Sequence, residues 1–317
     1  MRAIQITEFG GPEVLRLTHL ADPAATDPFD VVDVTGAGVN YADTHQVENT
    51  YLASSTLPLV PGSEVVGLTA DGRRVASLVG VGGYAEKALV LPALTFEVPD
   101  DVTDGQALAV LVQGLSAWHL LRTSTHLAPG ETVVVHAAAG GVGTIAIQLA
   151  TAWGAGRVIA VASTADKREL ALSLGADTAV DAGAEDLTAA LRSANDGNPV
   201  DVVLEMVGGP TFDASLAALA PRGRLATYGM AGRVPPTPVD PLALMHGSRA
   251  VVGFWLVHFL TGPSMVAEPL NQMFAMIAAG TLSPVVGATY PLADARQAHE
   301  DLRARRSIGK LVLDPRS

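Results

Sequence analysis

The stretch HAAAGGVGTIAIQLA, His136 to Ala150, decides the fold of this 317-residue chain. It follows the β-branched run TVVV (132–135), which is typical of a buried strand, and it continues as a long apolar helical pattern. Only small residues, including the pair Gly140-Gly141, separate the strand pattern from the helix pattern. Residues without bulk at a strand-to-helix turn indicate that another group approaches the main chain closely there.

The sequence around this turn alternates between strand and helix patterns. Strand patterns occur at residues 132–136, 157–163, 201–207 and 223–229, with a shorter one in GADTAVDAG (175–183). Helical patterns follow them at residues 141–154, 165–176, 184–194 and 211–220. Such alternation is typical of βαβ units and predicts an α/β domain with a doubly wound parallel sheet.

In this setting the glycine turn fits the dinucleotide fingerprint G-x-G-x-x-G, with Ala138 in place of the first glycine. Gly140 and Gly141 would let the main chain approach a diphosphate, and Gly143 would let the helix sit closely on the sheet. Amides of the first helical turn, including that of Val142, would face the phosphates. The alternative is a tight turn without a ligand.

The end of the next strand indicates which nucleotide is bound. Sites for NAD usually place Asp or Glu there, but this chain has Ser163 and Thr164, followed by Lys167 and Arg168. Hydroxyl groups followed by cations suit the 2′-phosphate of NADPH, although Asp166 weakens the signal. The alternative is a solvated helix start.

Composition excludes several classes of protein. Apolar residues make up 49% and charged residues 16%, which is enough for a large core, and the chain has no cysteine. The net charge of −12 argues against nucleic-acid binding. The first residues do not form a signal-peptide pattern, and no apolar run is long enough to span a membrane, so we expect a cytoplasmic protein.

Motifs along almost the whole chain resemble the zinc-independent medium-chain dehydrogenases/reductases, in particular their quinone oxidoreductase branch. The matching segments are FGGPEVL (9–15), GVNYADTHQ (38–46), LPLVPGSEVVG (57–67), VQGLSAWHLL (112–121), HAAAGGVGTIAIQLA (136–150), GFWL (253–256) and SIGKLVLDP (307–315).

The resemblance implies a Rossmann domain inserted in a GroES-like β-barrel catalytic domain. We expect the catalytic domain at residues 1–108 and 250–317 and the Rossmann NADP-binding domain at 109–249. It also implies a homodimer joined through the Rossmann sheets and an active site in the cleft between the domains.

The resemblance also argues against a metal. Zinc-dependent relatives hold the catalytic zinc with a cysteine where this chain has Asn40 and a histidine where it has Ser63. The four-cysteine structural zinc site is excluded because cysteine is absent. Without a Lewis acid, a conjugated acceptor is easier to reduce than a simple ketone.

On the catalytic side, the resemblance places Asn40 near the nicotinamide and the substrate oxygen, and makes Tyr41, His45 and Tyr51 further candidates. Asn40 could instead be a turn residue bonded to its own main chain. Asp43 is expected to cap a helix. The resemblance implies these further cofactor contacts: Gln113, Ser116, Val207, Gly208, Gly229, Met230, Phe254, Trp255, Leu256 and Lys310. Relatives often have a tyrosine against the 2′-phosphate where this chain has Ala182, which would weaken the preference for NADPH.

These features lead to one main hypothesis and two alternatives. The main hypothesis is an NADPH-dependent reductase of quinones or other conjugated carbonyls. The first alternative is a 2-enoyl thioester reductase, suggested by GFWL. The second is a NADPH-binding sensor or structural protein without turnover.

Overall fold

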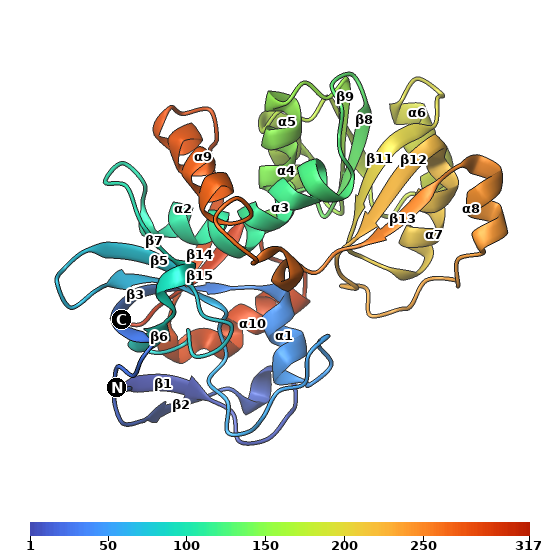
Figure 1. Ribbon diagram of the computed structural model, residues 1–317. Coiled ribbons are helices and arrows are strands. Elements are labelled where there is room, and N and C mark those ends of the chain that lie inside the picture. The colour runs from blue at the N-terminus through green and yellow to red at the C-terminus, as the bar shows by residue number, and fades with distance from the viewer. The chain divides into compact units, whose positions relative to one another are not determined.

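The computed structural model describes the whole chain, Met1 to Ser317, as two compact units (Figure 1). Unit 1 comprises residues 1–113 and 262–317, and unit 2 comprises residues 114–261. The first division falls within a π-helical turn, η3 (Val110–Gly114). The boundary expected after residue 249 lies before β13, which belongs to the sheet of unit 2, so unit 2 extends further than the sequence indicated.

Unit 2 contains a six-stranded parallel sheet in the order β10-β9-β8-β11-β12-β13. Its strands are β8 (Thr132–His136), β9 (Arg157–Ala162), β10 (Thr178–Asp181), β11 (Val200–Glu205), β12 (Leu219–Thr227) and β13 (Ala250–Gly253). This is the Rossmann strand order, in which the direction of winding reverses between β8 and β11. Ligands of such sheets bind at the carboxyl ends of the strands beside that reversal.

Helices cover the sheet of unit 2 (Figure 1). They are α3 (Leu115–His119), α4 (Gly141–Ala152), α5 (Ala165–Ser173), α6 (Leu187–Ala194), α7 (Gly209–Ala218) and α8 (Pro241–Gly247), with a π-helical turn, η4 (Leu120–Ser124), and a 3-10 turn, η5 (Leu256–Phe259). Leu191 of α6 and Phe212 of α7 pack with Val134 and Val203 of the central strands. Strand β8 is buried along its whole length, and its neighbours β9 and β11 are buried except at one residue each, which explains their nearly continuous apolar sequence.

Unit 1 is built on a mostly antiparallel sheet in the order β14-β15-β3-β4-β5-β7, with β6 paired to β3. Its strands are β3 (Asp30–Val39), β4 (Glu64–Leu68), β5 (Arg74–Leu78), β6 (Lys87–Val90), β7 (Thr95–Glu97), β14 (Val286–Pro291) and β15 (Lys310–Asp314), and a separate hairpin comprises β1 (Arg2–Gln5) and β2 (Arg16–His19). The C-terminal strand β15 pairs with β3, so both ends of the sequence build one sheet.

Unit 1 has four α-helices. They are α1 (Tyr41–Val47), α2 (Asp104–Ala109), α9 (Ala267–Ala278) and α10 (Ala295–Arg303), with 3-10 turns η1 (Pro12–Val14), η2 (Pro92–Leu94) and η6 (Leu292–Asp294). Strands β4 and β5 form a hairpin whose turn contains Asp71 and Gly72, and Gly72 has a φ of 82°. The predicted α/β fold, with the parallel sheet inserted between two segments of a β-rich unit, is confirmed.

No helix is both long and apolar enough to cross a bilayer.

A buried histidine links the first strand of the Rossmann sheet to a covering helix. His136, the last residue of β8, is fully buried, and its Nε2 lies 2.8 Å from Oγ of Ser215 on α7. Burial lowers the pKa of His136 to about 4, because the imidazolium would lose its hydration.

We expect this histidine to make the fold acid-sensitive. Its pKa is about 4 in the folded state and about 6.5 when unfolded, so its contribution is complete above pH ~6.5 and decreases as the pH falls toward 4. The change is about 1.4 kcal/mol per pH unit. The free energy of unfolding, measured in urea between pH 4 and 7, should therefore change less steeply with pH in His136→Gln than in the parent. The two slopes should differ by about 1.4 kcal/mol per pH unit. Parallel profiles for the two proteins would contradict this assignment.

Candidate nucleotide site and buried polar network

The turn between β8 and α4 has no room for a side chain at Gly143, the last of its three glycines. A Cβ atom on Gly143 would lie 2.5 Å from the carbonyl oxygen of Ala137 and 2.8 Å from Cα of Ala138. Gly140 is the N-cap of α4 and offers no side chain to the amides of the first helical turn. Those amides, at the positive end of a 12-residue helix, form a cradle suited to a phosphate group.

One residue of this turn was not singled out from the sequence. Ala137 has a φ of 49°, in the left-handed region that costs a residue with a Cβ about 1 kcal/mol. The turn is held by hydrogen bonds from Gly140 N–H to Ala137 O (2.8 Å) and from Ala138 N–H to Val161 O (3.1 Å). Main-chain hydrogen bonds therefore hold the turn against the neighbouring strand β9.

The neighbouring strand β11 ends in a buried carboxyl group. Oε1 of Glu205 accepts hydrogen bonds from the amides of Val207 (2.6 Å) and Gly208 (3.0 Å), whereas its Oε2 has no partner. Burial raises the pKa of Glu205. The carboxyl group shapes the loop that contains the predicted cofactor contacts Val207 and Gly208. Glu205 was not identified from the sequence, although a charged residue inside the apolar run DVVLEMV was a visible signal.

The loops after β11 and β12 are joined to each other. Ala231 N–H donates to Met206 O (2.8 Å), and Gly232 N–H donates to Val207 O (2.7 Å). Gly208 has a φ of 81°, and a Cβ there would lie 2.9 Å from Cγ of Met230. The predicted contacts Val207, Gly208, Gly229 and Met230 thus lie together at the carboxyl edge of the sheet.

At the end of β9, Ser163 and Thr164 are exposed. Thr164 is the N-cap of α5, and its hydroxyl accepts from the amide of Lys167 at 3.4 Å. The segment after β13 contributes aromatic rings: Phe254 is buried, with its ring 4.8 Å from that of Phe259. The ring of the half-buried Trp255 lies 5.1 Å from that of His258.

The second group of predicted residues lies in unit 1, where Asn40 is almost completely buried. Its Nδ2 donates to Oε1 of Glu64 (2.7 Å) and to Oγ of Ser63 (3.3 Å). Its Oδ1 accepts from Nζ of Lys310 (3.0 Å) and from Nε2 of Gln113 (3.4 Å). Both ends of the Asn40 amide are thus engaged by protein groups, which fixes its orientation.

The same network contains a fully buried ion pair. Lys310 on β15 and Glu64 on β4 are both inaccessible to solvent and are in direct contact. Oε2 of Glu64 also accepts from the amide of Val112 (2.9 Å). The ammonium group of Lys310, which the sequence motifs placed near the nucleotide, is bonded to Glu64 and Asn40 within this network. Its partner Glu64 was not identified from the sequence.

The network in unit 1 also includes the carboxyl group of Asp43. Its Oδ2 accepts from the amide of Asn40 (2.8 Å) and from the hydroxyl of Tyr84 (2.9 Å), which also lies 3.0 Å from Nε2 of His299. The expected capping role of Asp43 at the start of α1 is confirmed. Burial raises the pKa of Asp43 to about 6 despite these hydrogen bonds and lowers that of His299 to about 4.

The remaining catalytic candidates are partly accessible. Tyr41 and His45, one turn apart on α1, have ring centroids 5.5 Å apart, and Nδ1 of His45 lies 2.9 Å from Oγ1 of Thr50. Tyr51 lies in the irregular segment after α1 and is half-buried. Ser116, on α3 of unit 2, is buried.

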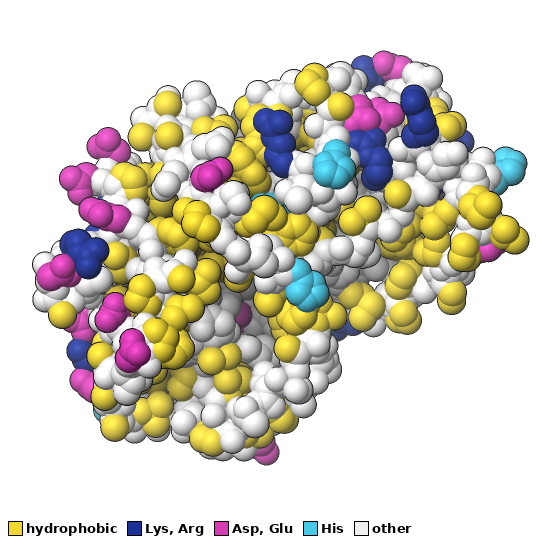
Figure 2. Space-filling model, viewed as in Figure 1, with side chains coloured by type: hydrophobic (Ala, Val, Ile, Leu, Met, Phe, Trp, Pro, Cys, Tyr) yellow, Lys and Arg dark blue, Asp and Glu magenta, His cyan; other side chains and the backbone are white.

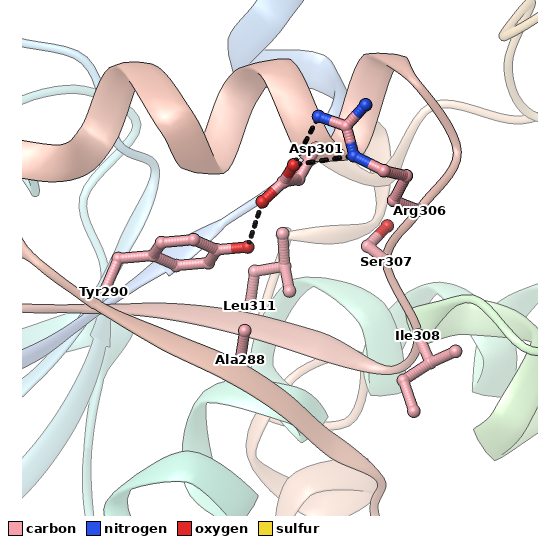
Figure 3. Close-up of a pocket in the computed structure, with 7 residues that line it drawn as sticks. All are labelled: Ala288, Tyr290, Asp301, Arg306, Ser307, Ile308 and Leu311. Carbon is pink, nitrogen blue, oxygen red and sulfur yellow. Dashed lines mark hydrogen bonds and ion pairs between the residues drawn. The ribbon is translucent and has the colours of Figure 1, made fainter.

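A hollow of about 230 Å³ in unit 1 lies apart from all these residues (Figure 3). The hydroxyl of Tyr290 donates to Oδ2 of Asp301 (2.8 Å), and Nε of Arg306 donates to Oδ1 (2.9 Å). Three of the polar side chains at its wall, those of Tyr290, Asp301 and Arg306, are therefore bonded to one another.

Comparison with known proteins agrees with this geometry. The family model described as zinc-binding dehydrogenase matches residues 141–278. A quinone oxidoreductase of Pseudomonas aeruginosa is 34% identical over 99% of both chains. A mycobacterial protein solved in complex with NADPH has a TM-score of 0.93 at 39% identity, covering 99% of this chain and 100% of that one. Escherichia coli quinone oxidoreductase, also complexed with NADPH, has a TM-score of 0.93 at 31% identity, with 99% and 100% covered.

Fold and sequence thus define a two-domain oxidoreductase with a Rossmann sheet. The chain belongs to the medium-chain dehydrogenase/reductase superfamily, in its quinone oxidoreductase branch, as the sequence motifs predicted.

We expect the buried pair to be costly to break. Lys310→Met leaves the buried carboxyl group of Glu64 without its counter-ion, which should lower the free energy of unfolding by about 3–5 kcal/mol. The double variant Glu64→Gln/Lys310→Met buries no charge and should recover more than half of that loss. Denaturant unfolding of Lys310→Met, Glu64→Gln and the double variant measures this. A loss below ~0.5 kcal/mol in the single variant, or additive losses in the double variant, would contradict the expectation.

Proposed function

We propose that this protein is a metal-independent reductase that uses NADPH to reduce quinones and other conjugated carbonyl compounds. The observation that carries the proposal is the cradle at Gly140–Gly143, where α4 begins so close to β8 that Gly143 has no room for a side chain and no side chain caps the amides of the first turn. The relatives named quinone oxidoreductase, and the neighbours solved with NADPH, support the choice of substrate and nucleotide.

A second feature that fits the nucleotide is the side chain of Gln113. Oε1 of Gln113 is buried and has no hydrogen-bond partner in the protein, and a buried acceptor is normally satisfied. The nicotinamide carboxamide carries an N–H donor of the required kind. In this proposal Gln113, held through Asn40, accepts from the carboxamide, and Ser163, Thr164 and Lys167 lie toward the adenine ribose.

NADPH supplies a hydride, and the protein must orient the acceptor and stabilise the negative charge that develops on its oxygen. The amide hydrogens of Asn40 are directed to Glu64 and Ser63, so Asn40 acts by fixing the start of α1 and the side chain of Gln113. The partly accessible groups Tyr41, His45 and Tyr51 then provide the donors to the substrate oxygen. Lys310 is a positioning residue, because its ammonium orients Asn40 from within the core.

Turnover and binding test this proposal together. NADPH oxidation should be observed with quinones and enones and should be slower with crotonyl thioesters. Gly143→Ala should weaken NADPH binding by about tenfold or more, because its Cβ would displace the cradle. Gly262→Ala, whose added Cβ meets no atom within 4 Å, is the matched control. Faster turnover of crotonyl thioesters than of quinones would favour a thioester reductase, and tight NADPH binding without turnover of any acceptor would contradict a reductase.

The proposal includes a homodimer formed through the Rossmann sheets. Strand β13 is the last strand of its sheet, and an edge strand can pair with a second copy. Beside it in sequence, α8 exposes Leu242 and Met245, which are 70% and 73% accessible. Figure 2 shows hydrophobic side chains gathered at the end of unit 2 where α8 lies, on the right of the view.

Light scattering after size-exclusion chromatography should therefore give twice the chain mass of 32.6 kDa. The variant Leu242→Glu/Met245→Glu should shift the protein toward the monomer, because each substitution would bury a carboxylate in the interface. A monomeric parent protein at micromolar concentration would contradict the dimer.

A further inference from the structure

An ion pair lies across the carboxyl ends of β9 and β10. Nη1 of Arg168 is 2.9 Å from Oδ2 of Asp181, the last residue of β10, and donates to the carbonyl oxygen of Ala162, the last residue of β9, at 3.1 Å. Oδ1 of Asp181 accepts from the amide of Gly183 at 2.8 Å. The guanidinium and the carboxylate are therefore held in place by the main chain as well as by each other.

This location is the one at which doubly wound sheets distinguish the two nicotinamide nucleotides. The end of the second strand faces the adenine ribose, where a carboxylate favours the free 2′-hydroxyl and an arginine accommodates the 2′-phosphate. Here β9 is that second strand, and the residues that follow it, Ser163 and Thr164, are neutral. A carboxylate is supplied at this edge by the third strand, β10, through Asp181, which pairs with Arg168.

The charges around the site cancel. In residues 162–168 and 178–183 the cations are Lys167 and Arg168, and the anions are Asp166 and Asp181. A 2′-phosphate entering this region would meet no net positive charge, and it would have to compete with Asp181 for the guanidinium of Arg168. The side chains of Arg168 and Asp181 are 24% and 50% exposed, so both can be reached by a ligand.

We propose that Asp181 limits the preference of this protein for NADPH over NADH, because it pairs with Arg168 and places a carboxylate beside the 2′-phosphate position. This inference rests on the proposed function, in which NADPH binds across the carboxyl edge of the sheet. NADPH has to displace the carboxylate from the arginine or bind next to it, whereas NADH, which carries a 2′-hydroxyl, can bind with the pair intact. Asp181 and Arg168 are thus determinants of nucleotide specificity.

The chain provides a matched control at the other end of the same strand. Arg157, the first residue of β9, forms an ion pair of 2.7 Å with Asp196. Asp196→Asn removes the same charge from the same kind of pair, but at the amino edge, away from the nucleotide. The control separates a local effect at the 2′-phosphate from the change in net charge of the whole protein.

Dissociation constants of NADPH and NADH, measured by calorimetry on the substrate-free protein, test the proposal. Asp181→Asn should raise the preference for NADPH by about tenfold, mainly through tighter NADPH binding, because a like charge next to the phosphate is removed. Arg168→Gln should lower that preference, and Asp196→Asn should leave it within about twofold of the parent value. ADP-ribose with and without a 2′-phosphate, which lack the nicotinamide, should show the same pattern.

An unchanged or reduced preference in folded Asp181→Asn, with normal NADPH binding by the parent protein, would overturn this proposal alone. An increase of the same size in Asp196→Asn would also overturn it, because the effect would then be one of net charge. If the parent protein bound neither nucleotide nor either ADP-ribose, the proposed function would fail and this inference with it.

Discussion

The absence of a Cβ at position 143 is the constraint on which the nucleotide site depends. A methyl group there would contact the main chain of Ala137 and Ala138, so α4 could not begin directly against the end of β8. The close start brings the positive end of α4 to the point where the winding of the sheet reverses, beside the end of β11. The buried carboxyl group of Glu205 shapes the loop on the other side of that point.

The main feature of unit 1 is a pair of buried charges, those of Lys310 and Glu64. Lys310 and Glu64 lie in a core that is otherwise largely apolar, where an ion pair contributes little net stability compared with apolar side chains. The pair holds both ends of the Asn40 amide and, through it, Gln113, so its value lies in orientation. We interpret the network as a rigid support that lets partly accessible side chains on and after α1 contact a substrate.

Periodic and local signals in the sequence were sufficient for the fold. The strand–helix alternation and the glycine turn predicted the parallel sheet, and the motifs at both ends predicted that one sheet is built from both. The second boundary was placed too early because AVVG is short and its pairing with β12 depends on tertiary structure. The motifs singled out Asn40 and Lys310, whose roles toward nicotinamide and nucleotide stay predictions. They did not indicate the ion pair of Lys310 with Glu64, because contacts between residues 246 positions apart leave no local pattern. Arg168 was visible as a cation near the ribose, whereas its pairing with Asp181 required the register of β9 and β10.

The most direct test of the central claim is to observe the amides of the cradle themselves. In the NMR spectrum of protein labelled with ¹⁵N-glycine, addition of NADPH should shift the amide signals of Gly140, Gly141 and Gly143 most strongly. Glycines at other turns, such as Gly72 between β4 and β5 and Gly130 before the amino end of β8, should be unaffected. Unchanged signals from residues 140–143 at a concentration that saturates the protein would contradict the claim that the diphosphate rests on this turn.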